Sequence, residues 1–174
     1  MVRAIPKRIR VLSDAQEKSG RLAFPERIFW NPPGRFDSVI LETPTLERTL
    51  ETADYSIDGW EHLVLVERKG SMDELATNLL GGDAARQRRS FERMRVSTRH
   101  PILLLDFSLT KSYTKRRTEV PTFKIMDALF RACQEFGLHL LWLPRPTGPE
   151  GGPPYGDRIV RLMWNLVWKE LETP

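Results

Sequence analysis

The chain has 174 residues, about the length of one domain, and its 40% hydrophobic and 29% charged residues are ordinary for a globular protein. No apolar run approaches the roughly 18 residues of a membrane span, and no signal-peptide core follows the basic N-terminus. The single cysteine, Cys133, excludes an internal disulfide and a cysteine-built zinc site. We therefore expect a cytoplasmic protein without a membrane partner, and its net charge of +4 permits a polyanionic partner.

In the first part of the chain, short apolar runs predict strands at residues 8–12, 39–42 and 63–66. Residues 55–60 read as a hairpin arm that turns at Asp58-Gly59. The run Leu63–Val66 is apolar at four consecutive positions, which is typical of a strand buried on both faces.

From Ser71 onward, helices and strands alternate. Ser71 and Glu74 form a capping box that opens one helix, and Asp83 can cap a second helix that runs to about Val96. A strand at 102–107 precedes a helix that starts near Pro121 and ends before Gly137. A strand at 138–143 and an amphipathic helix at 157–171 complete the chain. This order predicts a single α/β domain over residues 1–174 with a mixed central sheet flanked by helices.

Charged residues follow directly on the buried strand. Glu67 and Lys69 should share one face of the strand and Arg68 the other, because side chains alternate along a strand. Asp54 lies upstream at a turn, and Asp73 lies in the first turn of the capped helix. Three carboxylates beside one lysine can hold a hard divalent cation and position a water molecule.

Each of these features also has a plain structural interpretation. Glu67 and Lys69 could form an ordinary ion pair at a strand end. Asp73 could simply favour the helix dipole, and Asp54 could be a common turn residue. Charges at the end of a buried strand still need an explanation, so the pattern by itself leaves the metal site and the structural interpretation open.

The spacing of these residues resembles that of the nuclease domain of the XPF/Mus-type structure-specific endonucleases. That domain belongs to the PD-(D/E)xK superfamily and has a restriction-endonuclease-like fold. The family pattern is Gly-Asp, a spacer, and Glu-Arg-Lys-x-x-x-Asp, which this chain matches with Ala53-Asp54, Glu67-Arg68-Lys69 and Asp73. An arginine-rich helix and an apolar strand that ends in Asp106 are similar as well, so the likeness covers about residues 8–172.

The chain departs from the family pattern at three points. Ala53 stands where the family has a glycine before the acid, where glycine would serve a tight backbone geometry. The segment Asp14–Lys18 resembles an earlier acidic motif of the family, but Gln16 stands where an arginine is usual. The compact form, with Asp58-Gly59 between Tyr55 and the strand, resembles the phage and prokaryotic members more than the eukaryotic ones, whose helix-hairpin-helix module does not follow within these 174 residues.

The resemblance implies a Mg²⁺-dependent endodeoxyribonuclease of DNA repair or recombination that cuts branched or flap DNA, with Mn²⁺ as a substitute for Mg²⁺. Asp54 and Glu67 would bind the metal, Asp73 and Asp14 would be further ligands, and Glu17 would help Asp14 complete a second cation position. Lys69 would orient or help deprotonate the attacking water. Arg68 stays open between a structural ion pair and a phosphate contact.

The family likeness also places an arginine-rich helix near the site, and Arg86, Arg88, Arg89 and Arg93 on it are candidate DNA contacts. A second basic cluster lies at Lys111, Lys115, Arg116 and Arg117. Either cluster could instead be a solvated surface.

The family commonly dimerises, so a homodimer or heterodimer is expected, as is association with the nucleoid. Trp142, Trp164 and Trp168 are expected to build either the core or an interface, and the final helix with Trp164 and Trp168 could contribute to a dimer interface. A catalytically inactive DNA-binding or scaffolding subunit and a restriction-type enzyme that acts on plain duplex are the alternative functions.

Overall fold

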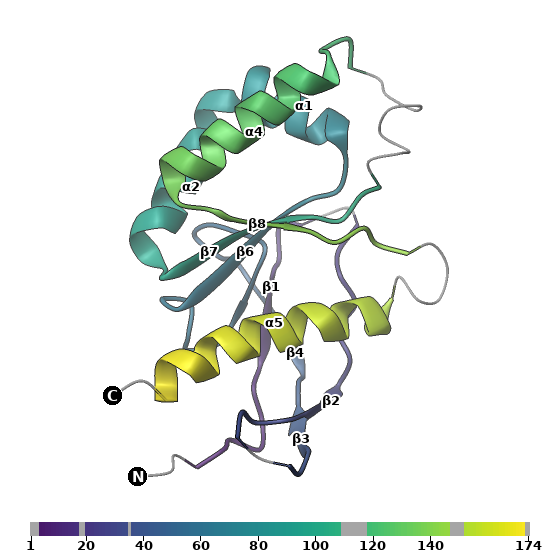
Figure 1. Ribbon diagram of the computed structural model, residues 1–174, viewed down its shortest axis with the longest axis vertical. Coiled ribbons are helices and arrows are strands. Elements are labelled where there is room, and N and C mark those ends of the chain that lie inside the picture. The colour runs from purple at the N-terminus through teal and green to yellow at the C-terminus, as the bar shows by residue number, and fades with distance from the viewer. Residues whose placement is uncertain (1–3, 18–19, 35, 109–117, 147–151, 173–174) are drawn as a thin grey trace. The chain divides into compact units, whose positions relative to one another are not determined.

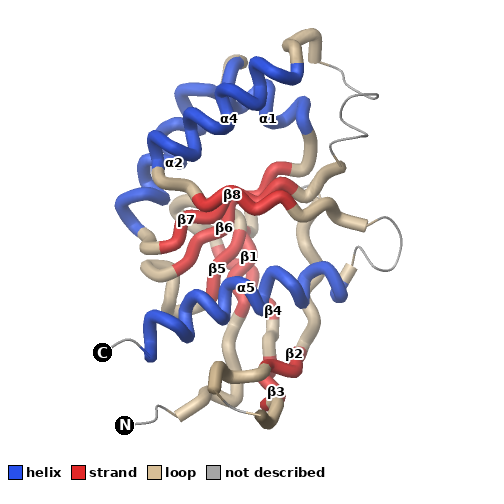
Figure 2. The backbone as a smooth tube through the Cα atoms, in the orientation of Figure 1, coloured by secondary structure: helices blue, strands red, loops and turns tan. Residues whose placement is uncertain are grey.

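The computed structural model describes residues 4–17, 20–34, 36–108, 118–146 and 152–172, and Figures 1 and 2 show their helices and strands. The chain divides into two compact units, which we describe one after the other. Unit 1 comprises Met1–Leu50, Tyr55–Val64 and Pro146–Pro174, and unit 2 comprises Glu51–Asp54 and Leu65–Arg145.

Unit 1 is built on strand β1 (Val11–Asp14). This strand pairs in parallel with β4 (Thr45–Arg48) and antiparallel with β5 (Tyr55–Ile57). Strands β2 (Arg27–Trp30) and β3 (Val39–Glu42) form a separate antiparallel pair. Helix α5 (Pro153–Glu172) packs against β2 and β5 and covers their apolar side chains.

A cluster of tryptophans fixes helix α5 in unit 1. The Trp30 ring lies 5.6 Å from that of Trp164 and 5.1 Å from that of Trp168, and the Trp60 ring lies 5.6 Å from that of Trp164. Edge-on aromatic pairs at this spacing stabilise a core beyond their buried area. Trp164 and Trp168 are buried inside their own unit. Of the two places expected for these residues, core and interface, the core is therefore confirmed, and dimerisation stays a prediction.

Unit 2 contains β6 (Val64–Lys69, in this unit from Leu65 onward), β7 (His100–Leu105) and β8 (His139–Trp142), hydrogen-bonded in that order, with β7 and β8 parallel. Its helices are α1 (Met72–Leu80), α2 (Ala84–Ser97) and α4 (Thr122–Phe136), which lie together over one face of these strands (Figure 1). The core between the two layers includes Leu65, Leu103 and Leu105 from the strands and Leu75, Phe91 and Leu129 from the helices.

Most predicted elements are present, and parallel and antiparallel pairs both occur, so the α/β class with a mixed sheet is confirmed. Two strands, β2 and β4, were not predicted, and β1 begins at Val11 rather than at residue 8. The single domain over residues 1–174 stays a prediction. Within the described ranges, no helix combines the length and the apolar character that a bilayer span requires.

Helices α1 and α2 start where the sequence signals place them, with two differences in their caps, whereas α5 begins at Pro153, four residues before its predicted start. Ser71 Oγ accepts a hydrogen bond from the Glu74 amide at 3.1 Å, as a capping box requires. The Glu74 carboxylate, however, accepts from the amide of Gly70 at 2.8 Å, one residue earlier than in the standard motif. Asp83 occupies the N-cap of α2 but makes no side-chain capping bond, and its carboxylate instead pairs with Arg86 at 3.4 Å.

A close backbone approach in unit 1 gives a test of its packing. A methyl group on Gly156 of α5 would lie 2.0 Å from the carbonyl oxygen of Ala23, so the helix or the loop must move. We expect Gly156→Ala to lower the free energy of unfolding by about 1–3 kcal/mol in urea titrations. Gly82→Ala is the control, since its methyl group meets open space, and a change of less than about 0.5 kcal/mol is expected. Equal effects of the two variants would contradict the packing.

Candidate active site at the end of strand β6

Strand β6 ends in an acid and a lysine that are both buried. The Glu67 and Lys69 side chains are 10% and 6% exposed, and Lys69 Nζ donates to Glu67 Oε1 at 2.6 Å. Arg68 points to the other face, where its Nε donates to Asp106 Oδ2 at 2.6 Å. The predicted alternation of side chains, with Glu67 and Lys69 on one face of the strand and Arg68 on the other, is therefore confirmed. Each face of the strand end carries its own ion pair.

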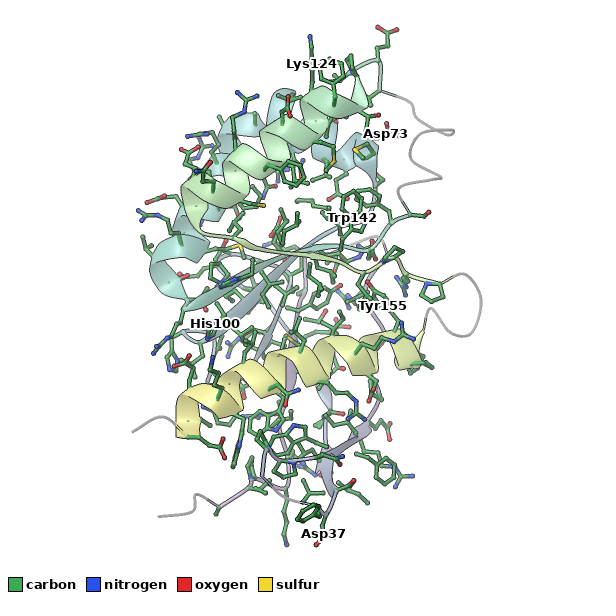
Figure 3. All side chains as sticks on the ribbon, in the orientation of Figure 1. Asp37, Asp73, His100, Lys124, Trp142 and Tyr155 are labelled. Atoms are coloured by element: carbon green, nitrogen blue, oxygen red, sulfur yellow. The ribbon has the colours of Figure 1, made fainter. Side chains whose placement is uncertain are left out.

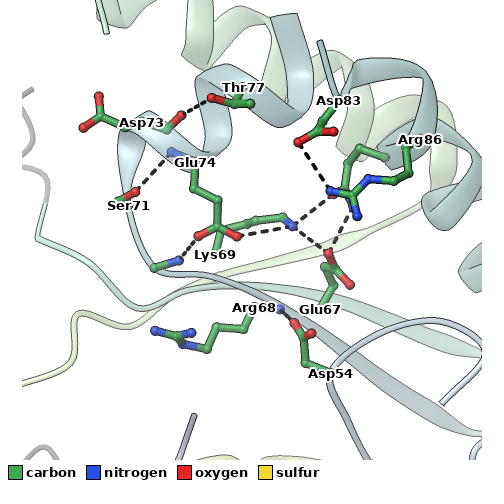
Figure 4. A network of polar contacts seen from close by, with 12 residues as sticks. Asp54, Glu67, Arg68, Lys69, Ser71, Asp73, Glu74, Thr77, Asp83 and Arg86 are labelled. Carbon is green, nitrogen blue, oxygen red and sulfur yellow. Dashed lines mark hydrogen bonds and ion pairs between the residues drawn. The ribbon is translucent and has the colours of Figure 1, made fainter. Parts of the chain in front are cut away.

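Asp54 lies beside this strand end (Figure 4). Its Oδ2 accepts a hydrogen bond from the backbone amide of Arg68 at 2.6 Å, and its own amide donates to the carbonyl of Val66 at 2.9 Å. Two backbone-directed bonds thus hold Asp54 next to Glu67, although 12 residues separate the two acids in the sequence. The structure brings together Asp54, Glu67 and Lys69 of the predicted motif (Figure 4).

The residue before Asp54 has an unusual backbone conformation. Ala53 has φ of +69°, in the left-handed region, and is the only non-glycine residue with positive φ in the described part of the chain. An L-residue with a Cβ is strained there, whereas glycine is not. A glycine at this position, as in the family pattern, would therefore serve the backbone turn that delivers the acid to β6.

The surroundings of Lys69 act on its pKa in opposite directions. Burial lowers the pKa, whereas the negative charges of Glu67, Glu74 and Asp54 and the hydrogen bond to Glu67 raise it, and the net effect is a raised pKa. Lys69 is therefore an ammonium group at neutral pH. In this state it can donate hydrogen bonds and offset negative charge, which fits the orienting role better than proton abstraction.

Sequence reasoning missed two residues that contact Lys69. Gln87 of α2 is buried, and its Oε1 accepts from Lys69 Nζ at 3.0 Å while its Nε2 donates to Glu67 Oε1 at 3.1 Å. Glu74 of α1 has an oxygen 3.6 Å from Lys69 Nζ. The capping box had pointed to Glu74, but only as a helix-start residue.

The side chain of Asp73, the last acid of the motif, points away from the site (Figure 4). Its carboxylate lies away from Lys69 in Figure 4, and Figure 3 marks its position at the start of α1. Asp73 Oδ1 accepts a hydrogen bond from the backbone amide of Thr118 at 2.9 Å, which ties the chain at Thr118 to the start of α1. The structure thus does not bring Asp73 to the Lys69 pair, and Glu74 is the α1 acid that faces it. A metal role for Asp73 stays a prediction.

Asp14 and Glu17 belong to unit 1 and have partners there. Asp14 Oδ1 accepts from the amide of Leu50 at 3.1 Å, and Glu17 accepts from the hydroxyl of Tyr55. Both contacts hold the chain around the end of β1. Their proposed part in a second cation position stays a prediction.

The donor set fits a magnesium ion that keeps most of its water. Among the described residues, no group of three or more histidines, cysteines or acids is arranged to hold a metal. Asp54 and Glu67 nevertheless offer two carboxylates at one place, and Mg²⁺ in enzymes is commonly bound by one or two carboxylates, several waters and substrate phosphates. These two acids could hold Mg²⁺ only with ligands from water and substrate.

The four candidate DNA contacts on α2 differ in their surroundings. Arg88 makes a two-pronged contact with Glu135 and lies 5.2 Å from the centre of the Phe136 ring, so its charge is already compensated. Arg86 pairs with Asp83. Arg89 and Arg93 are exposed, one helical turn apart, and have no ion-pair partner in the described ranges. The cluster at Lys111, Lys115, Arg116 and Arg117 lies outside the described residues.

The strand order of the two units, the helix layer and the buried acid–lysine pair define a restriction-endonuclease-like α/β protein. No protein-family model and no curated protein matches the sequence. The structure is similar to XPF from Aeropyrum pernix, with a TM-score of 0.58 and 14% identity over 91% of this chain and 61% of that chain. It is also similar to XPF from Aeropyrum pernix in complex with DNA, with a TM-score of 0.58 and 15% identity over 93% of this chain and 66% of that chain.

These similarities establish the fold. The chain has the fold of XPF, and the resemblance drawn from its sequence motif is confirmed at this level. The chain spans less than two thirds of the length of each XPF chain.

The conformation of Ala53 gives a test of how Asp54 is positioned. We expect Ala53→Gly to change the free energy of unfolding by less than about 1 kcal/mol, because the relief of backbone strain is offset by the loss of a buried methyl group. Ala53→Val should cost about 1–3 kcal/mol, because a β-branched residue is poorly tolerated at positive φ. Urea unfolding of the two variants decides, and a valine variant as stable as the glycine variant would refute the assigned backbone turn.

Proposed function

We propose that this protein is a metal-dependent DNA endonuclease that hydrolyses phosphodiester bonds, with branched or flap DNA as its substrate. The observation that carries the proposal is the convergence of Asp54 and Glu67 beside Lys69 at the end of a central strand. The chain has the fold of XPF, and XPF from Aeropyrum pernix has been solved in complex with DNA.

Each residue of the site has a defined part in the proposed reaction. Asp54 and Glu67 would hold Mg²⁺, which when bound polarises the phosphoryl group and stabilises the leaving oxygen. Lys69, held as an ammonium by Glu67, would orient the attacking water and offset the charge that develops on the phosphate. Arg68 is engaged by Asp106 on the opposite face, which favours its structural role over a phosphate contact.

Removal of either the acid or the lysine tests this assignment. We expect Asp54→Asn and Lys69→Ala to reduce cleavage of flap or forked DNA in Mg²⁺ or Mn²⁺ by at least about 100-fold, because charge stabilisation at a reacting phosphate is a large contribution to catalysis. The substrates are flap, fork, Holliday-junction and plain duplex DNA, with EDTA as the metal-free reference. Glu67→Gln serves as a third site variant.

The matched controls are Asp127→Asn and Lys124→Ala, which make the same changes at exposed positions on α4. Full cleavage by both Asp54→Asn and Lys69→Ala would remove the assigned site. Binding of branched DNA without cleavage in any metal would favour the inactive DNA-binding subunit. Equal cleavage of duplex and branched DNA would favour the restriction-type enzyme.

The surroundings of the α2 arginines predict which of them bind DNA phosphates. We expect the double variant Arg89→Ala/Arg93→Ala to bind DNA more weakly. The negative slope of log affinity against log salt concentration should become shallower by about 2, since each phosphate contact contributes close to 1 to its magnitude. Arg88→Ala should leave the slope nearly unchanged, because Glu135 already occupies its guanidinium. Fluorescence anisotropy with the Asp54→Asn chain at several salt concentrations measures the slope. A larger effect from Arg88 would contradict the prediction.

A further inference from the structure

A buried amide from helix α2 completes the Glu67–Lys69 pair. Gln87 lies at the start of α2 and is only 6% exposed, although its neighbours Arg86 and Arg88 are exposed. A buried amide is costly unless both of its ends are hydrogen-bonded. Both ends of Gln87 are bonded, and their partners are the two charged groups of the site.

These three side chains form a closed ring of hydrogen bonds. Glu67 Oε1 accepts from Lys69 Nζ at 2.6 Å and from Gln87 Nε2 at 3.1 Å, and Lys69 Nζ also donates to Gln87 Oε1 at 3.0 Å. Two donors on one oxygen fix the orientation of the carboxylate. The other oxygen, Glu67 Oε2, has no hydrogen-bond partner among the residues that the structure describes. Oε2 is therefore the oxygen left for a ligand.

We propose that Gln87 is a positioning residue of this site, which holds Glu67 Oε1 and Lys69 Nζ so that Glu67 Oε2 stays available to a divalent cation. The inference rests on the proposed function, because it assigns Gln87 to the same site. Gln87 acts through Glu67 and Lys69 and does not itself contact the cation or the DNA.

Glutamine is the side chain that this role requires. The contact needs an acceptor for the lysine and a donor for the glutamate, and an amide carries both. Methionine has nearly the same length but neither group. Asparagine has both groups but is one methylene shorter, so it cannot reach both partners at the observed distances.

The variants Gln87→Met and Gln87→Asn test the proposal, with Gln134→Met, an exposed glutamine on α4, as the matched control. The first measurement is the affinity of the DNA-free full chain for Mn²⁺ by calorimetry. We expect Gln87→Met to weaken Mn²⁺ binding by about 10–100-fold, the usual effect of removing a group that orients a metal ligand. Gln87→Asn should fall between Gln87→Met and the unaltered chain, and Gln134→Met should match the unaltered chain.

The second measurement separates positioning from DNA binding. In single-turnover cleavage of flap DNA, the rate constant of Gln87→Met should fall by about the same factor as its Kd for Mn²⁺ rises. The affinity of this variant for DNA in Ca²⁺ should stay unchanged. A purely structural role would move the urea midpoint and leave both Mn²⁺ affinity and the rate constant of the folded variant unaltered.

A folded Gln87→Met chain with normal Mn²⁺ affinity would overturn the proposal. If the methionine variant does not fold, the Mn²⁺ affinity of Gln87→Asn decides between the positioning role and a structural role. A chain that binds Mn²⁺ but cleaves no DNA would refute the nuclease function alone, and the Mn²⁺ affinities of the variants would still decide the role of Gln87. No binding of Mn²⁺ by the unaltered chain would overturn the positioning role directly.

Discussion

The buried contact between Lys69 and Glu67 is the constraint on which the site depends. Removing an ammonium and a carboxylate from water costs several kcal/mol for each ion, and their attraction offsets this only with good geometry and further hydrogen bonds. Gln87 of α2 supplies those hydrogen bonds, and Glu74 of α1 places a second negative charge near the ammonium. One strand and two helices must therefore be correctly placed around Lys69 before the pair is stable.

Asp54 is positioned by the backbone rather than by charge. Its carboxylate accepts the amide of Arg68 and its amide donates to Val66, so its place is set by the same strand that carries Glu67. The positive φ of Ala53 is the local condition for this arrangement. The two acids thus reach one location by different means, one through a strand position and one through a turn held against that strand.

The sequence predicts the strand, the alternation of its charged end and the helix starts because these signals are local. Gln87 could not be predicted, since an isolated glutamine among arginines gives no sign of which helix face is buried, and that depends on how α2 packs in the helix layer. Strand β4 is exposed at all four positions and exists through its pairing with β1, so no apolar pattern marks it. The arginines of α2 are equivalent in the sequence, but only the structure shows that Glu135 compensates Arg88.

The two ion pairs at the end of β6 differ in a way that bears on function. Arg68 and Asp106 lie on the face opposite to Glu67, with side chains 11% and 2% exposed, and their contact ties the ends of β6 and β7 together. Glu67 has one oxygen that two donors hold and another without a partner in the described ranges, next to a second acid. Apolar residues often replace a buried ion pair without loss of stability. A buried pair that leaves one carboxylate oxygen uncommitted beside Asp54 (Figure 4) is the arrangement on which the proposed cation site rests.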